Sequence, residues 1–201
     1  MASKKGYILV EGHGEIEAAH NLIARLSQDV GLFLPWTTPR RWPNLHLWEA
    51  QRRGGILAGA EFIRGKTDAG ALLILRDEDD ACPRELAPKI ANRLRALDLP
   101  FPAAYVLFHP EYEVLFLPCL DLIGFPPWKE KSWEARRGIK EWLSRQLPTG
   151  RSYKPTVDQV WMTRGIDFER LREASVPCFG SLERAIAFLR DNLGSKGTVY
   201  P

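Results

Sequence analysis

Three short apolar segments, each followed within three residues by an acidic residue, constrain the fold of this chain more than any other feature. The clearest is residues 70–76, a nearly continuous apolar run that leads into the acidic residues 77–80. Runs of this kind are typical of strands that are buried on both faces of a parallel sheet. Residues 7–10 and 103–108 have the same character, and each is also followed by glutamate. We therefore expect three strands of one parallel sheet.

Segments with helical periodicity separate these strands. Apolar residues recur at helical spacing within residues 15–28, 55–65 and 84–97. The alternation of strand and helix predicts an α/β domain with a mostly parallel sheet flanked by helices. Another short strand is expected at residues 31–34, which Pro35 closes.

Helices dominate the predicted structure after residue 113, where the strands are expected to stop. The predicted helices cover residues 112–120, 132–147, 156–163, 167–174 and 181–193. Ser181 is the expected N-cap of the last one. We expect an α/β core over residues 1–120 and a helical C-terminal extension over residues 121–201, packed together as a single unit.

Composition narrows the class of protein. The 201 residues suit one domain or one domain with a subdomain, and 45% apolar with 26% charged residues is ordinary for a globular chain. No apolar run approaches the roughly 20 residues of a membrane span, and residues 7–10 are too short for the core of a signal peptide. The three cysteines are far apart and lack a CxxC spacing. A cytoplasmic protein without structural zinc or disulfides is therefore expected.

The charge is unevenly distributed, although the net charge is only +3. Acid is concentrated at residues 77–80, whereas the preceding segment and the C-terminal third are basic. The basic residues are Arg40, Arg41, Arg52, Arg53, Arg64, Lys66, Arg136, Arg137, Lys140, Arg145, Arg151 and Lys154. Acid focused inside a basic surround suits a metal-assisted site for a polyanion.

The carboxylates that follow the three strands are expected to meet at one edge of the sheet, because ligands of parallel α/β sheets bind at the carboxyl ends of the strands. These are Glu11, then Asp77 with Asp79, then Glu111 with Glu113. Carboxylates gathered closely repel one another and normally need a cation. Oxygen donors favour Mg²⁺ or Mn²⁺, and such ions assist phosphoryl transfer.

Simpler interpretations stay open for several of these residues. Asp79 or Asp80 could cap the helix that follows, and Glu15 with Glu17 could only favour the helix dipole. His13 is expected to be a loop residue, because nothing pairs with it at metal-ligand spacing. The glycines at 12 and 14 could cradle a phosphate on backbone amides.

Two of the motifs resemble the TOPRIM domain, which topoisomerases, bacterial primases, recombination mediators and the overcoming-lysogenization-defect nucleases share. They are the Glu-Gly pair after the first strand, in residues 8–15, and the Asp-x-Asp after a later strand, in residues 73–80. The whole chain is similar to a bacterial TOPRIM-like family called domain of unknown function 4276. Residues 111–113 (Glu-Tyr-Glu), 153–159 (Tyr-Lys-Pro-Thr-Val-Asp-Gln) and 178–182 (Cys-Phe-Gly-Ser-Leu) carry that likeness.

The resemblance implies a role for each matching residue. Glu11 would act as general acid or base or bridge metals, Asp77 and Asp79 would hold the divalent ion, and Lys154 would steady the scissile phosphate. The implied catalytic residues are Glu11, Asp77, Asp79 and Lys154. The implied metal ligands are Glu11, Glu15, Asp77, Asp79, Glu111 and Glu113. The candidate substrate-binding residues are His13, Arg76, Asp158 and Gln159. Arg76 departs from the family's apolar pattern and is expected to pair with the acidic cluster when no metal is bound.

The function expected from this likeness is a nuclease that depends on Mg²⁺ or Mn²⁺ and cleaves DNA or RNA. Primase and topoisomerase roles require large domains that 201 residues do not supply. The resemblance also implies an SMC- or recombination-like ATPase as partner in anti-phage defence. Two other hypotheses remain: a non-catalytic interaction module of the same fold, and a receiver-like phospho-acceptor with Asp77 or Asp79 as the modified group.

Overall fold

One five-stranded sheet, parallel throughout, organises the computed structural model, which describes residues 3–130, 132–133 and 137–201. The strand order is β2-β1-β3-β4-β5. The strands are β1 (Lys5–Val10), β2 (Arg40–Arg41), β3 (Ala69–Asp77), β4 (Ala103–Phe108) and β5 (Val199–Tyr200). The predicted α/β fold with a parallel sheet is confirmed.

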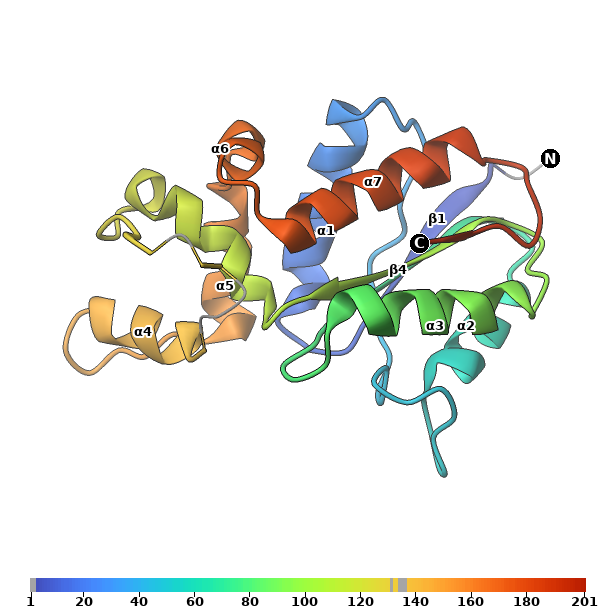
Figure 1. The fold of residues 1–201 in the computed structure, drawn as a ribbon, viewed down its shortest axis with the longest axis horizontal. Coiled ribbons are helices and arrows are strands. Elements are labelled where there is room, and N and C mark those ends of the chain that lie inside the picture. Colours follow the sequence, from blue (N-terminus) through green and yellow to red (C-terminus); the bar gives the residue numbers. More distant parts are fainter. Residues whose placement is uncertain (1–2, 131, 134–136) are drawn as a thin grey trace.

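Helices cover both faces of this sheet (Figure 1). Helices α2 (Ile56–Arg64) and α3 (Pro83–Arg95) pack on one face, and α1 (Glu15–Asp29) and α7 (Pro177–Asp191) pack on the other. Successive side chains of β3 alternate between these two cores, as the period of a strand requires. Ile74 lies in the core under α2 and α3, whereas Leu75 lies in the core under α1 and α7.

A group of shorter helices lies beyond the carboxyl ends of the strands, at the left of Figure 1. It consists of the 3₁₀ helix η1 (Tyr112–Ile123), α4 (Ile139–Gln146), α5 (Pro155–Arg164) and α6 (Phe168–Glu173). Helix η1 is mostly buried, and α5 packs along α1. The C-terminal part of the chain thus closes one end of the sheet and then returns along it through α7 and β5.

Two strand predictions are wrong. Residues 31–34 form no strand: Gly31 leaves α1 with a positive φ of 76°, Leu32 turns into the core, and Phe33 is 87% exposed. The strand in that region is β2, only two residues long and paired with the end of β1. Strands also do not stop at residue 113, because β5 pairs with the start of β4. Two-residue strands have no hydrophobic period that a sequence pattern could show.

Two helix starts also differ from the prediction. Helix α4 begins at Ile139 rather than residue 132, and residues 134–136 of that prediction lie outside the described residues. Helix α7 begins at Pro177, so Ser181 lies inside the helix and is not its N-cap. Proline suits the first helical position, because its missing N–H would have no partner there and its φ is already helical.

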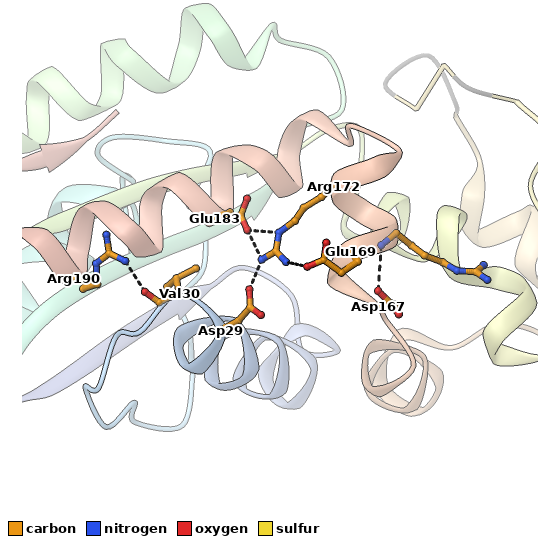
Figure 2. Close-up of polar contacts among 8 residues, drawn as sticks. Asp29, Val30, Asp167, Glu169, Arg172, Glu183 and Arg190 are labelled. Atoms are coloured by element: carbon orange, nitrogen blue, oxygen red, sulfur yellow. Dashed lines mark hydrogen bonds and ion pairs between the residues drawn. The ribbon is translucent and has the colours of Figure 1, made fainter.

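Arg172 ties three helices together on the α1 and α7 side of the molecule (Figure 2). Its guanidinium group, from α6, pairs with Asp29 at the end of α1, with Glu169 of α6 and with Glu183 of α7. The Nε and Nη2 atoms lie 2.8 and 2.6 Å from Glu183 Oε1. In the same view Arg190 Nη1 donates to the carbonyl oxygen of Val30 at 2.6 Å. These contacts hold α6 and α7 against α1.

No helix in the described part of the chain combines the length and the apolar character that crossing a membrane requires.

Candidate functional site

The predicted acidic residues lie at the carboxyl edge of the sheet, at the point where its winding reverses. Strand β1 has β2 on one side and β3 on the other, and the helices that lead into those two strands pack on opposite faces. In doubly wound sheets this is where ligands bind. Glu11 follows β1, Asp77 ends β3, and Glu111 and Glu113 stand at the start of η1 after β4.

The ammonium group of Lys140, from α4, lies among three of these carboxylates. Its Nζ atom is 2.9 Å from Glu111 Oε2, 3.4 Å from Glu113 Oε2 and 3.7 Å from Asp77 Oδ2. The Lys140 side chain is 36% exposed, whereas the Glu113 side chain is fully buried. The cluster therefore extends from the core to the surface, and three carboxylates share one ammonium group.

Two of the three carboxylates hold one oxygen on a backbone N–H group and turn the other toward Lys140. Asp77 Oδ1 accepts a hydrogen bond from the N–H of Tyr112 at 2.8 Å. Glu111 Oε1 accepts one from the N–H of Ile139, the first residue of α4, at 3.0 Å. The orientation of each carboxyl group is thus set by the backbone at the start of a helix.

Glu113 is held in the same way, but by side chains. Its Oε1 atom accepts hydrogen bonds from the Tyr153 hydroxyl at 2.8 Å and from Gln159 Nε2 at 3.3 Å. Its Oε2 atom has no hydrogen-bond partner and faces Lys140. Tyr153 precedes α5 and Gln159 lies within it, so that helix positions the most deeply buried carboxylate of the cluster.

Glu15, in the first turn of α1, is a fourth buried carboxylate beside this cluster. It is 8% exposed, and its Oε2 atom has no hydrogen-bond partner. The side chain folds back over Gly12, where an added Cβ would lie 2.6 Å from Glu15 Oε1. Burial raises the pKa of Glu15; the Glu11 charge adds to this, while the backbone of Gly12 and the ammonium of Lys140 oppose it. A role in the helix dipole alone would not require this burial.

Burial and mutual repulsion also raise the pKa of other carboxyl groups in the cluster. The pKa of Asp77 is held well above its usual value, first by burial and then by the charges of Glu15 and Glu113. Burial raises the pKa of Glu113 to about 7, against the opposing effect of Lys140. The pKa of Lys140 is raised too, because the attraction of the carboxylates outweighs burial, which acts to lower it. One ammonium group therefore does not fully stabilise the charged form of these carboxyl groups, which hold their protons more tightly than free carboxyl groups do.

The turn after β1 packs directly on the start of α5. A Cβ at Gly14 would lie 2.6 Å from Pro155 Cβ and 2.8 Å from Gln159 Oε1, so this close approach excludes any larger residue. The sequence left open that Gly12 and Gly14 cradle a phosphate on their backbone amides. In the structure the Glu15 side chain lies against Gly12, and Pro155 and Gln159 of α5 lie against Gly14.

Glu11 lies at the rim of the site rather than within the Lys140 cluster. Its Oε1 atom is 3.0 Å from Nδ1 of His46, and its side chain is 31% exposed. His13, in the same turn, is exposed. The charge of Glu11 influences Glu15, but the Glu11 side chain is partly open to solvent.

The structure separates Asp77 from Asp79, which were expected to meet at the same edge of the sheet and to hold the same divalent ion. Strand β3 ends at Asp77, so the alternation of side chains stops there. Glu78 turns inward and accepts hydrogen bonds from the N–H groups of Asp80 and Ala81 at 3.1 and 2.8 Å, whereas Asp79 is exposed. The alternative that Asp79 or Asp80 caps α3 does not hold either, because the N-cap is Cys82 and no side chain caps that helix.

Arg76 lies on the opposite face of β3 from Asp77. It is 5% exposed, pairs with Glu78, and donates from Nε to the Tyr105 hydroxyl at 2.8 Å. The expected pairing of Arg76 with the acidic cluster is thus replaced by a pairing with Glu78. Its burial also leaves it out of reach of a substrate at the carboxylate cluster.

The motif at residues 153–159 divides into different roles. Lys154 is exposed at the N-cap of α5. Asp158 is buried and occupied locally: it accepts from the N–H of Lys154 at 2.7 Å and pairs with Arg151. Gln159 contacts Glu113 from inside the helix. Only Lys154 is therefore placed to meet a substrate directly.

Three residues at the site were not singled out from the sequence: Lys140, Tyr153 and His46. Lys140 was visible only as one of many basic residues in the C-terminal third, and Tyr153 only as part of a motif. His46 lies in a segment without regular periodicity. Each reaches its carboxylate from a distant part of the chain, so no local spacing could have indicated it.

The donor set suits a hard divalent cation such as Mg²⁺ or Mn²⁺, since every candidate ligand is a carboxylate oxygen. The buried oxygens of Glu15 and Glu113 without hydrogen-bond partners support the same interpretation. Among the described residues, no three His, Cys, Asp or Glu side chains stand ready to hold a metal ion. The reason is geometric: the carboxylates are spaced around an ammonium group at 2.9–3.7 Å. A Mg²⁺ ion needs oxygens at about 2.1 Å.

No family model, curated protein or solved structure matched this chain when it was compared with each of the three.

Proposed function

We propose that this protein is a divalent-metal-dependent nuclease of TOPRIM type that hydrolyses phosphodiester bonds of DNA or RNA. The observation that carries the proposal is the group of Glu15, Asp77, Glu111 and Glu113 around one ammonium group at the winding reversal of a parallel sheet. Structural ion pairs normally balance charge. A surplus of carboxyl groups around one cation, with raised pKa values at Glu15, Asp77 and Glu113, is an arrangement found where a protein binds a cation.

Asp77, Glu111 and Glu113 would hold the ion through the oxygens that face Lys140, with Glu15 beside them. A bound Mg²⁺ or Mn²⁺ ion supplies Lewis acidity at the phosphate and lowers the pKa of a water molecule. The chain positions these oxygens in advance: the N–H of Tyr112 orients Asp77, and Tyr153 with Gln159 orients Glu113. Glu11, half-buried at the rim and paired with His46, would accept a proton from the nucleophile.

A nucleic acid is the proposed substrate because basic side chains surround the acidic site. Arg41 donates from Nε to the carbonyl oxygen of Glu11 at 3.2 Å, which places a guanidinium group beside the rim carboxylate. Arg52 and Arg53 in the following loop are exposed, and so is Lys154 on the α5 side. Phosphate groups passing the site would meet cations on both sides of it. The TOPRIM likeness adds an SMC- or recombination-like ATPase as the proposed partner in anti-phage defence.

Cleavage assays on plasmid DNA and on tRNA with Mg²⁺ or Mn²⁺ test this function. Asp77→Asn should lower the rate by about a thousandfold or more, because it removes a ligand charge at the reacting centre. Glu11→Gln should also lower it strongly. Asp79→Asn is the matched control, since Asp79 is the exposed neighbour, and we expect less than a tenfold change there. Full activity in both Asp77→Asn and Glu11→Gln would show that the chemistry is assigned to the wrong residues.

A second candidate is a non-catalytic interaction module of the same fold, and the position of Lys140 favours it. An ammonium group already placed among the carboxylates is also what a site without metal would need. The two candidates differ in metal binding. Calorimetry that detects no Mg²⁺ or Mn²⁺ binding, with and without nucleic acid, would support the interaction module.

A further inference from the structure

Lys140 contacts the same oxygens that a divalent ion would need. The other oxygens of Asp77, Glu111 and Glu113 are engaged by Tyr112, Ile139, Tyr153 and Gln159. The oxygens left for a cation are the three that lie 2.9–3.7 Å from Lys140 Nζ. An ammonium ion and a metal ion close together repel each other strongly where water is scarce. The two cations therefore exclude one another from these carboxylates.

We propose that Lys140 is a resident counter-ion that alternates with the divalent metal ion, and that a nucleic-acid phosphate receives its ammonium group when the metal enters. This inference rests on the proposed function for the identity of the metal and of the polyanion. It concerns how metal and substrate binding are coupled, which the presence of a metal site alone does not determine.

The ammonium group satisfies the cluster only in part, which gives a divalent ion an advantage once it arrives. Glu113 Oε2 lies 3.4 Å from Nζ without a hydrogen bond, and Glu15 Oε2 has no hydrogen-bond partner. Both atoms are buried, and a buried carboxylate oxygen without a partner is costly. A doubly charged ion would neutralise more of this charge than a lysine does.

The Lys140 side chain can move away from the carboxylates without unfolding helix α4. Its side chain is 36% exposed and is a flexible aliphatic chain with the charge at its tip. Helix α4 itself is anchored independently, because the N–H of Ile139 donates to Glu111 Oε1. The ammonium group can therefore swing toward solvent, where a phosphate of the substrate would be, while α4 stays in place.

Thermodynamic linkage turns this exchange into a measurable coupling. Any anion that holds the Lys140 ammonium group outside the cluster must raise the affinity of the cluster for the metal ion. The metal ion must then raise the affinity for that anion by the same factor. A merely structural Lys140 predicts neither effect, because its removal would only leave a buried charge cluster without a partner.

The first measurement is the Mn²⁺ dissociation constant by isothermal titration calorimetry on the full chain without nucleic acid. Lys140→Met keeps the aliphatic stem and removes the charge, and we expect its Mn²⁺ affinity to exceed the native value by at least about tenfold. Lys140→Arg keeps the charge and should bind Mn²⁺ within about twofold of native. Lys89→Met, an exposed lysine of α3 on the other face of the sheet, should match the native protein. Melting followed by circular dichroism confirms that each variant is folded.

The second measurement repeats these titrations with a phosphorothioate DNA oligonucleotide, which resists cleavage. The oligonucleotide should raise the Mn²⁺ affinity of the native chain at least about fivefold, and that of Lys140→Met by less than about twofold. If the oligonucleotide raises the Mn²⁺ affinity of the native chain and of Lys140→Met equally, the proposal that the Lys140 ammonium group moves to a phosphate is overturned.

The outcomes separate this inference from the proposed function. A folded Lys140→Met protein that binds Mn²⁺ no better than the native chain, or not at all, overturns the alternation. Tighter Mn²⁺ binding by Lys140→Met without any nucleic-acid cleavage by the native chain supports the alternation and contradicts the nuclease assignment. Nucleic-acid cleavage by the native chain, together with no gain in Mn²⁺ affinity in Lys140→Met, supports the nuclease assignment and contradicts the alternation.

Discussion

The two faces of the end of β3 carry charge in opposite ways. On the α2 and α3 side, one buried arginine meets one buried carboxylate: Arg76 pairs with Glu78, and Tyr105 and two backbone N–H groups complete the contacts. On the α1 and α7 side, Asp77 joins other carboxylates around Lys140. Arg76 and Asp77 are adjacent in β3, yet Arg76 belongs to a balanced ion pair and Asp77 belongs to an unbalanced cluster.

This difference separates an arrangement whose charges balance within the protein from one in which one ammonium group faces several carboxylates. A balanced buried pair whose carboxylate oxygens are both engaged leaves no uncompensated negative charge for a cation. The network of Arg172 in Figure 2 is structural for another reason: one guanidinium group meets three carboxylates that link α1, α6 and α7, but their side chains are 28–75% exposed, so water screens the surplus charge. The Lys140 cluster lacks the balance of the Arg76–Glu78 pair, and the Oε2 atoms of Glu15 and Glu113 are buried without hydrogen-bond partners.

The most direct test of this difference is to neutralise one carboxylate on each face and to compare the free energies of unfolding. Glu78→Gln leaves the Arg76 guanidinium group buried without a counter-charge, and we expect a loss of about 3 kcal/mol in the free energy of unfolding. Asp77→Asn keeps an oxygen for the N–H of Tyr112 and relieves repulsion, so it should cost less than about 1 kcal/mol. Urea unfolding at pH 7.5 measures both. Equal losses would mean that the two faces are not different in kind.

The pH dependence of stability sharpens the same comparison, with an effect that is at most as large. Burial raises the folded-state pKa of Glu113 from 4.5 to about 7, so the folded protein binds this proton more tightly than the unfolded chain does. Its contribution to stability is therefore complete below pH 4.5 and is lost as the pH rises toward 7. Relative to Glu113→Gln, the native protein should lose up to about 3 kcal/mol across that range.

Urea unfolding at several pH values from 4.5 to 7.5 checks this sign. Glu78→Gln serves as the control from the other face, because the pKa of Glu113 does not depend on that ion pair. A native protein that gains stability relative to Glu113→Gln as the pH rises would contradict the raised pKa.

The smallest expected effect comes from one buried hydroxyl group on each face. Tyr153→Phe removes the donor to Glu113, and Tyr105→Phe removes the acceptor of Arg76 Nε. Each should cost about 1–2 kcal/mol of stability, because a charged group loses one hydrogen bond. Only Tyr153→Phe should raise the pKa of Glu113 further, since that hydroxyl group favours the ionised form. Carboxyl titration by NMR distinguishes the two variants, and an unchanged pKa of Glu113 in Tyr153→Phe would argue against the assigned contact.

Much of the fold follows from the local sequence. The apolar runs of β3 and β4 and the helical periods of α1, α2 and α3 are long enough to show their spacing, and their order predicts a parallel sheet. The local sequence did not predict the short strands β2 and β5, because they have two residues each and form only through pairing with longer strands. The start of helix α7 was predicted four residues late, since a proline start competes with a serine cap in the same stretch.

The candidate site divides in a similar way. The sequence by itself determined that Glu11, Asp77, Glu111 and Glu113 meet at one edge, because parallel strands bring their carboxyl ends to the same side. Only the tertiary structure decided that Lys140 from α4 lies among them, that Tyr153 and Gln159 hold Glu113, and that Asp79 stays outside. Strand order is encoded in local periodicity, whereas the partner of a buried charge is set by packing between segments far apart in the chain.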